Sequence, residues 1–306
     1  MPLKIGFNLP QTTQYDLAAD VPTFAREAER IGYDSLWVLE RVLTPIDQSG
    51  IHGLYGVPGL AWPDVYHDVA DPLITLAQAA AVTTRISLGT GVLVAPLHHP
   101  VRLAKSLASL DVAAGGRLIA GLGSGWSVDE YAATSRRPMA ERGAALDEFL
   151  DTTAALWGAD PVSASGSGFE VAPSYFSPKP AGNVPIYLAG ASEPALRRIV
   201  RRGLGWFPTG LSVEQTTQTL SRLRDRAGAD VPCIVQVSYL STTRVPADGR
   251  QEFTGSPDQL MEDVAALAAG GVKHVYLTMS AAALGLTELL DAAEQVYEAA
   301  RRAQLV

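Results

Sequence analysis

Short runs rich in apolar and β-branched residues alternate with longer helical patterns along the whole 306-residue chain, and this alternation constrains the fold most. It is typical of units in which a strand is followed by a helix, so that a parallel sheet forms with helices outside it. The strand-like runs are Leu3–Leu9, Ser35–Leu39, Ile86–Val92, Arg117–Gly121, Pro185–Leu188, Gly205–Pro208, Cys233–Ser241 and His274–Met279. The helical patterns are Val21–Ile31, Asp71–Val82, Pro100–Ala114, Glu141–Trp157, Glu193–Arg202, Val213–Ala227, Pro257–Ala269 and Leu286–Arg302.

Eight such units predict a closed (β/α)8 TIM barrel. An open doubly wound sheet more usually has about five or six strands and a glycine-rich turn after the first strand. Here the first strand-like run leads into Asn8, Leu9 and Pro10 instead. Length alone would allow two domains, but α/β barrels often reach this length as one. We therefore expect a single TIM-barrel domain over residues 1–306.

Two connections are longer than the usual links in such a fold. Arg41–Ala70 follows the second strand, and Gly158–Asn183 follows the fourth helix. The first insertion carries the ring side chains Tyr55, Trp62, Tyr66 and His67. Because ligand pockets are lined mainly by apolar and aromatic side chains, we expect this insertion to form a lid over a flat ligand.

Candidate site residues are those that end the strands, since barrel enzymes carry their chemistry at the carboxyl ends of the strands. The strand-end candidates are Asn8, Glu40, Arg41, Thr90, Gly91, Gly123–Trp126, Gly190–Ser192, Thr209, Gln236 and Ser280. Glu40 and Arg41 are charged residues directly after an apolar strand. They either pair with each other or support the site structurally, or they handle the substrate or a proton.

Two glycine-containing segments at these strand ends favour a cofactor site. Gly121–Trp126 differs from a dinucleotide fingerprint, because Trp126 replaces its last glycine and the loop follows the fourth strand. It is either a plain turn or a loop that packs against a flat cofactor. Gly190–Ser192 leads into a helix whose free N–H groups would attract an anion, and Ser192 could also be an ordinary helix cap.

Charge and hydropathy exclude several other classes of protein. The chain has 24 Lys and Arg against 32 Asp and Glu, a formal charge of −8, and its basic residues cluster only on one helical face, at Arg197, Arg198, Arg201 and Arg202. We therefore expect no nucleic-acid partner. The chain also has neither a signal-peptide pattern at its start nor an apolar run of about 18 residues, so we expect a cytoplasmic protein without a membrane partner.

The cysteine and histidine pattern argues against a metal site. Cys233 is the only cysteine, so the chain cannot form an internal disulfide. His98 and His99 are adjacent, so their side chains point in different directions, and we expect them to cap a helix or line a pocket. We predict no bound metal.

Several motifs together resemble the luciferase-like barrel proteins, which bind a flavin or the deazaflavin coenzyme F420. The resemblance covers nearly the whole chain. The motifs are Ile31–Arg41, Leu88–Val92 with His99 and Pro100, Leu110 and Asp111 before Gly115–Arg117, Gly121–Trp126 with Glu130, and Pro185–Gly190 with Gly205 and Trp206.

The resemblance implies where the cofactor would lie. Its ring would rest against Thr90, Gly91 and Val92, with a cis peptide bond between Gly91 and Val92. Its phosphate-bearing side chain would run past the Gly123–Trp126 loop toward the helix start at Gly190–Ser192. The cofactor-binding residues that we expect are Asn8, Thr90, Gly91, Val92, Gly123, Ser124, Gly125, Trp126, Tyr131, Gly190, Ala191 and Ser192.

The segment around Glu40 and the glycine-tryptophan loop look more like the F420 branch of this family. That branch implies an oxidoreductase that transfers hydride between the deazaflavin and a small organic substrate, and family resemblance also implies a homodimer. The alternative is an FMN-dependent monooxygenase that takes reduced flavin from a separate reductase and activates oxygen. A third possibility is a barrel that binds the cofactor without turnover.

Glu40 and Arg41 are the expected catalytic residues, but Arg41 departs from the F420 branch, which often has histidine at this position. Arginine does not give up its proton at ordinary pH. Arg41 would instead bind an anionic substrate or keep Glu40 ionised. The proton donor is left open among Glu40, Tyr131, His67 and His99.

Overall fold

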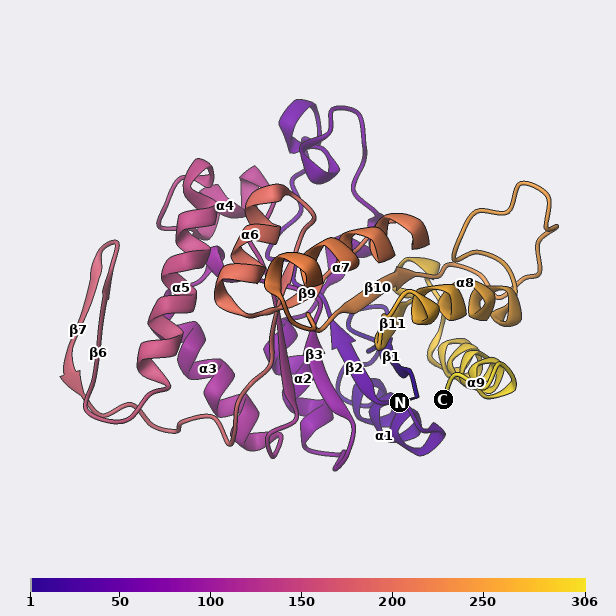
Figure 1. Cartoon of the computed structure of the whole chain (residues 1–306), viewed down its shortest axis with the longest axis horizontal. Coiled ribbons are helices and arrows are strands. Elements are labelled where there is room, and N and C mark those ends of the chain that lie inside the picture. Colours follow the sequence, from indigo (N-terminus) through magenta and orange to yellow (C-terminus); the bar gives the residue numbers. More distant parts are fainter. Residues whose placement is uncertain (1) are drawn as a thin grey trace.

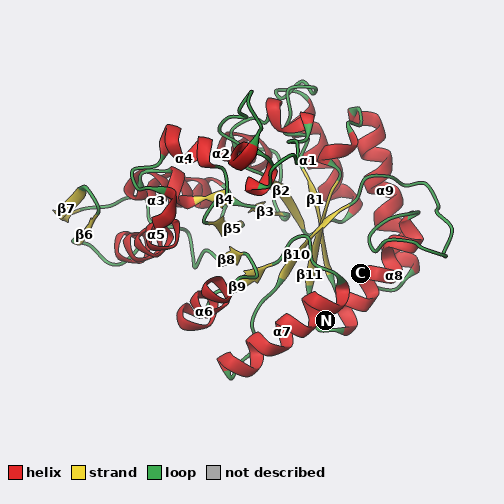
Figure 2. Ribbon diagram, turned by 90° about the horizontal axis from the view of Figure 1, so that it is seen from above, coloured by secondary structure: helices red, strands yellow, loops and turns green. Residues whose placement is uncertain are grey.

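The computed structural model describes residues 2–306, in which eight parallel strands form a barrel. Their order is β10-β11-β1-β2-β3-β5-β8-β9, and bridges from Trp206 to Cys233 and from Thr209 to Gln236 join the two ends of this row. The barrel strands are β1 (Lys4–Asn8), β2 (Ser35–Val38), β3 (Ser87–Thr90), β5 (Leu118–Gly123), β8 (Ile186–Ala189), β9 (Gly205–Phe207), β10 (Ile234–Ser238) and β11 (His274–Thr278). Helices surround these strands (Figure 2), so the predicted (β/α)8 fold is confirmed.

The helices begin and end close to the expected residues, except that α4 was not predicted. They are α1 (Asp20–Ile31), α2 (Pro72–Ala80), α3 (Pro100–Ala113), α4 (Val128–Thr134), α5 (Arg142–Leu156), α6 (Glu193–Arg202), α7 (Val213–Ala227), α8 (Pro257–Ala269) and α9 (Leu286–Arg302). The Asp71 carboxylate accepts hydrogen bonds from the N–H groups of Leu73 and Ile74 and so caps α2. Within residues 2–306, each helix is too short or too polar to cross a membrane.

The two insertions fold differently from each other. The segment from Arg41 to Ala70 contains three short 3₁₀ turns, η1 (Gly50–His52), η2 (Leu54–Gly56) and η3 (Asp64–Asp68), and it rises above the barrel in Figure 1. The segment from Gly158 to Asn183 forms an antiparallel hairpin of β6 (Val162–Gly166) and β7 (Phe169–Ser174), which projects from the side of the barrel (Figure 1). This hairpin was not predicted from the sequence. Further short elements are β4 (Leu93–Val94), which pairs with β5, η4 (Ala95–Leu97), η5 (Met139–Glu141) and η6 (Ser280–Ala282).

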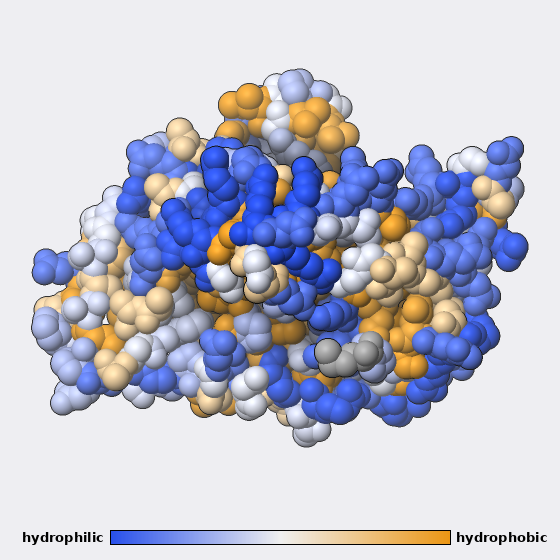
Figure 3. Space-filling model, viewed as in Figure 1, coloured by the Kyte–Doolittle hydropathy of each residue, from blue (hydrophilic) through white to orange (hydrophobic). Residues whose placement is uncertain are grey.

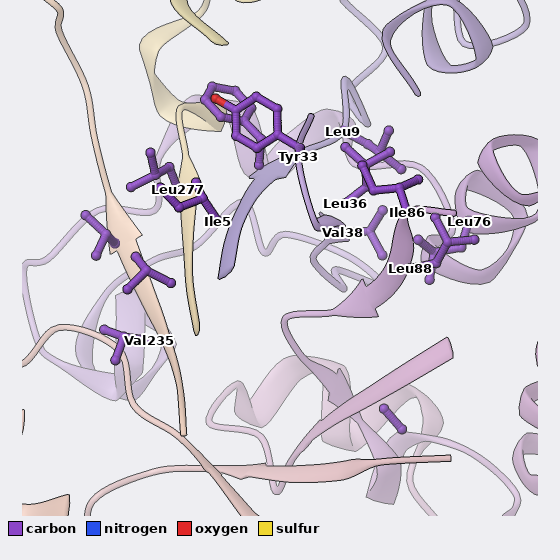
Figure 4. Packing of buried hydrophobic residues seen from close by; sticks show 14 of the residues in the cluster. Ile5, Leu9, Tyr33, Leu36, Val38, Leu76, Ile86, Leu88, Val235 and Leu277 are labelled. Atoms are coloured by element: carbon purple, nitrogen blue, oxygen red, sulfur yellow. The ribbon is translucent and has the colours of Figure 1, made fainter. Parts of the chain in front are cut away.

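Side chains fill both faces of the barrel wall. Those facing the helices form the main core, part of which is shown in Figure 4. Inside the barrel, Trp37 stacks on Tyr276 with ring centroids 4.7 Å apart and packs against Phe207. Gly89 makes room for them, because a Cβ there would lie 2.4 Å from the Trp37 ring. Since this interior is packed, the place for an active site is the barrel mouth.

Candidate functional site

The loop after β3 has an unusual backbone at the carboxyl end of the barrel. The peptide bond between Gly91 and Val92 is cis, as expected. Thr90 donates a hydrogen bond through Oγ1 to the Gly121 carbonyl at 2.8 Å, and the Gly91 N–H donates to the Val38 carbonyl at 2.7 Å. The loop is therefore anchored to both neighbouring strands, β2 and β5.

Gly91 has no room for a larger side chain. A Cβ there would lie 2.5 Å from the hydroxyl oxygen of Tyr276. Tyr276 is buried and also donates a long hydrogen bond of 3.4 Å to the Gly91 carbonyl. The interior aromatic cluster therefore supports the cis peptide bond from below.

Glu40 is paired with a residue that the sequence analysis assigned only a capping or lining role. Its carboxylate is 4% exposed, and Oε1 lies 2.6 Å from His98 Nε2. Oε2 accepts a hydrogen bond from the Val94 N–H. Burial lowers the pKa of His98, but the hydrogen bond and negative charge of Glu40 outweigh this and raise the pKa overall. The pair joins the end of β2 to the segment after the cis peptide bond.

Of the alternatives for Glu40 and Arg41, the structure does not show the mutual ion pair, because the two side chains pair with different residues. Arg41 Nη1 lies 3.0 Å from Glu130 Oε2, and the Val42 N–H donates to Glu130 Oε1 at 2.7 Å. Only 10% of the Arg41 side chain and 2% of the Glu130 side chain are exposed.

Aromatic rings surround the Arg41 guanidinium. Its carbon lies 4.9 Å from the ring centroid of Trp126, 5.5 Å from that of Tyr66 and 5.7 Å from that of Trp62. We call Arg41, Glu130 and these three rings the Arg41 cage. The charge of Arg41 is matched inside the cage by Glu130, and the side-chain partner of Glu40 is His98.

The insertion between Arg41 and Ala70 is fastened to α4 at two adjacent positions. One is the Arg41–Glu130 pair, and the other joins His52 Nδ1 to Asp129 Oδ1 at 2.9 Å. Trp62 Nε1 donates to the His52 carbonyl at 2.8 Å, and the Trp62 and Trp126 ring centroids are 4.6 Å apart. Two of the expected lid rings, Trp62 and Tyr66, are thus in the cage, whereas His67 is exposed.

The remaining proton-donor candidates are less suited to that role. The buried Tyr131 hydroxyl donates to the Ser124 carbonyl, and burial raises the pKa of Tyr131 well above its ordinary range. His99 packs against Phe169 of the β6–β7 hairpin with ring centroids 5.4 Å apart. Next to the cis peptide loop lies the hydrogen-bonded pair of Glu40 and His98.

The loop after β5 is partly buried, whereas the start of α6 is exposed. Gly125 has a φ of +78°, and a Cβ there would lie 2.6 Å from Val94 Cγ1, so the loop requires glycine. Gly190, Ala191 and Ser192 are exposed, and Ser192 is the N-cap residue of α6 but its hydroxyl makes no capping hydrogen bond. The free N–H groups and hydroxyl there suit a phosphate.

Asn8 has both ends of its amide bonded within the protein. Its Oδ1 accepts from the Met279 N–H at 2.7 Å, and its Nδ2 donates to the Leu9 carbonyl at 3.1 Å. Asn8 therefore joins the ends of β1 and β11, and its contact with a cofactor stays a prediction. Among the residues that the structure describes, no three His, Cys, Asp or Glu side chains are placed to hold a metal ion.

Comparison with known proteins identifies the family. Residues 6–252 match the family model described as luciferase-like monooxygenase. The chain belongs to the luciferase-like monooxygenase family. This luciferase-like protein is 31% identical over 254 residues to an uncharacterized protein of Mycobacterium tuberculosis, a match that covers 79% of this chain and 89% of the relative.

Two relatives with assigned activities are F420-dependent glucose-6-phosphate dehydrogenases. The one from Amycolatopsis mediterranei is 29% identical over 222 residues, which is 71% of this chain and 61% of the relative. The one from Beutenbergia cavernae is 31% identical over 249 residues, which is 78% of this chain and 68% of the relative.

Solved structures share the fold of this luciferase-like protein. A monooxygenase from Streptomyces bottropensis has a TM-score of 0.78 at 21% identity, and the match covers 99% of this chain and 100% of that one. An F420-dependent secondary alcohol dehydrogenase, in complex with an F420-acetone adduct, has a TM-score of 0.75 at 17% identity and covers 98% and 99% of the two chains.

Proposed function

We propose that this luciferase-like protein is a coenzyme F420-dependent oxidoreductase that transfers hydride between the deazaflavin and a small organic substrate. The observation that carries the proposal is the mouth of the barrel, where the Thr90–Val92 loop is anchored to both neighbouring strands and the uncapped start of α6 offers an anion site. The two F420-dependent dehydrogenase relatives support a deazaflavin over a flavin.

The residues at the mouth fit such a cofactor. The loop from Thr90 to Val92 would hold one face of the ring, the loop from Gly123 to Trp126 would run along the cofactor side chain, and Gly190–Ser192 would bind its phosphate. When bound, the deazaflavin supplies the carbon that gives or takes the hydride. The protein contributes orientation and excludes water.

Within this proposal, Glu40 handles the proton that accompanies the hydride, and His98 is its positioning partner. The Glu40 carboxylate lies 2.6 Å from His98, whose raised pKa lets the imidazole hold a proton beside it. Arg41 holds the insertion over the mouth through the cage and does not exchange a proton.

The second candidate is a monooxygenase that uses reduced FMN from a separate reductase. It is favoured by the family description and by the fold shared with a monooxygenase at a TM-score of 0.78. It also fits Arg41 better, because an arginine at this position cannot serve as the acid of a dehydrogenase. Oxygen consumption separates the two candidates.

The proposal is tested by titrating the protein with coenzyme F420 and with FMN in parallel, following the fluorescence of each cofactor. We expect tighter binding of the deazaflavin. A Gly91→Ala variant should lose at least about tenfold in affinity, because the Cβ would meet Tyr276 at 2.5 Å. A Gly182→Ala variant is the control, because a Cβ at Gly182 meets nothing within 4 Å.

The other outcomes are equally informative. Tighter binding of FMN, together with oxygen uptake in the presence of reduced flavin, would favour the monooxygenase. Binding of neither cofactor would refute the proposed cofactor site. Equal loss of affinity in the Gly91 and Gly182 variants would show that the cis peptide loop does not hold the ring.

A further inference from the structure

A groove lined by arginines lies beside the start of α6, outside the barrel mouth. Its volume is about 470 Å³. The residues used below are Arg197, Arg198 and Arg201 of α6, Arg226 of α7, Asp147 of α5, and Pro194 at the first turn of α6. We call this the cationic groove.

The cationic groove carries more positive than negative charge. Asp147 pairs with Arg198 Nε at 3.0 Å, with Arg201 Nη2 at 2.9 Å and with Arg202 Nη2 at 3.0 Å. One carboxylate thus faces three guanidinium groups, and Asp151 adds a second carboxylate only for Arg202. This excess is unusual in a chain whose net charge is −8.

Several of these guanidinium groups remain accessible to solvent. The Arg201 side chain is 65% exposed and the Arg226 side chain is 45% exposed. Arg197 is exposed as well. Hydrophilic side chains gather over α6 and α7 in Figure 3, in agreement with this exposure. An exposed guanidinium that already pairs with one carboxylate still has free N–H groups, and these can donate to a second carboxylate from a ligand.

The cationic groove continues from the proposed phosphate site. Pro194, which lines the groove, is two residues after Ser192. Arg226 Nη1 lies 2.8 Å from Glu193 Oε1, so the end of α7 meets the start of α6 directly after Ser192. An extended anion bound at Ser192 would therefore pass into the groove.

We propose that the cationic groove binds the acidic tail of the deazaflavin cofactor, the chain of glutamates attached beyond its phosphate. This rests on the proposed function, because FMN ends at its phosphate. The groove already binds a carboxylate, since Asp147 pairs with two of its arginines, Arg198 and Arg201. A tail that leaves the anion site at Ser192 meets Arg197, Arg201 and Arg226 next.

The test compares two forms of the deazaflavin, one carrying several glutamates and one carrying the phosphate but no glutamate. Their affinities are measured by fluorescence quenching at low and high salt. We expect the wild-type protein to bind the tailed form about tenfold more tightly at low salt, because a few exposed ion pairs contribute modestly. High salt should largely remove the difference.

The variants locate the effect. In an Arg197→Gln/Arg201→Gln protein the preference for the tailed form should fall to within about twofold, while the tailless form binds as before. An Arg302→Gln variant is the matched control, because Arg302 is 57% exposed and pairs with Asp258 at 2.7 Å on α8, away from the groove. Circular dichroism checks that each variant is folded.

The outcomes separate this inference from the proposed function. Equal affinity of the wild-type protein for the two forms would overturn the inference and leave the F420 proposal standing. A preference that persists in the double variant would also overturn it, because the tail would then bind elsewhere. Binding of neither form would overturn both proposals.

Discussion

Replacing Arg41 with methionine should release the insertion from α4. The substitution keeps a long apolar side chain but removes the guanidinium that pairs with Glu130 at 3.0 Å. Glu130 is 2% exposed, so its charge would be left buried with only backbone partners such as the Val42 N–H. Breaking a buried ion pair in this way typically costs about 3–5 kcal/mol.

The expected size of the effect lies near the lower end of that range, because Arg41 is 10% exposed and water can reach the site. About 3 kcal/mol corresponds to roughly a hundredfold change in an opening equilibrium. Contacts with the three rings of the cage add to this loss. The loss is local, because the cage holds an insertion and not a barrel strand.

Amide hydrogen exchange measures this local opening directly. The Val42 N–H donates to Glu130, so its exchange should become about a hundredfold faster in the Arg41→Met protein. An added Glu130→Gln substitution should restore part of the protection, because it removes the unpaired charge. An Arg302→Met variant, which loses an exposed pair, should leave Val42 unchanged.

The reasoning would be refuted by a change of less than about threefold in Val42 exchange in the Arg41→Met protein. Slower exchange in the single variant than in the double variant would also contradict it. Either result would mean that the rings of the cage, without the ion pair, hold the insertion in place.

Two further predictions concern pH and the anion site. Burial lowers the pKa of His98, but the hydrogen bond and charge of Glu40 outweigh it and raise the pKa above its ordinary value of 6.5. The Glu40–His98 pair therefore stabilises the fold fully below pH 6.5. Its contribution is lost progressively as pH rises through the raised pKa. As pH rises through the raised pKa, the free energy of unfolding of the wild-type protein should fall by about 1 kcal/mol more than that of a His98→Gln protein. Urea denaturation at several pH values measures this difference. Equal pH dependence of stability in the wild-type and His98→Gln proteins would contradict a stabilising pair between Glu40 and His98. A Ser192→Asp variant should bind the deazaflavin at least about tenfold more weakly by fluorescence titration, because a carboxylate would repel the cofactor phosphate. A Ser167→Asp variant on the hairpin loop is the control and should bind the deazaflavin as the wild-type protein does. Unchanged affinity in the Ser192→Asp variant would show that the phosphate does not bind at Ser192.

Much of the barrel could be predicted from local patterns. The bounds of α6, α7, α8 and α9 agree with the predicted helices, because apolar spacing and capping residues act within a few positions of one another. The β6–β7 hairpin was missed because Gly158–Asn183 is rich in glycine, serine and proline and resembles an irregular loop.

The cis peptide bond between Gly91 and Val92 was predicted through family resemblance and is present. The glycine there also has a local signal, since Gly91 interrupts a run of β-branched and apolar residues. The roles of the expected cofactor-binding residues stay predictions. Their common position at the carboxyl ends of the strands follows from barrel geometry alone.

The pairing of charged side chains was decided only by the tertiary structure. Glu40 meets His98 across 58 positions of sequence, and Arg41 meets Glu130 across 89. The adjacent charges in the sequence left a mutual ion pair open, but in the structure the two side chains pair with different residues. The sequence by itself determined which segments become strands and helices, because hydrophobic periodicity is local. Closure of the barrel then determined which distant side chains share its rim, because that depends on how eight separate strands are brought side by side.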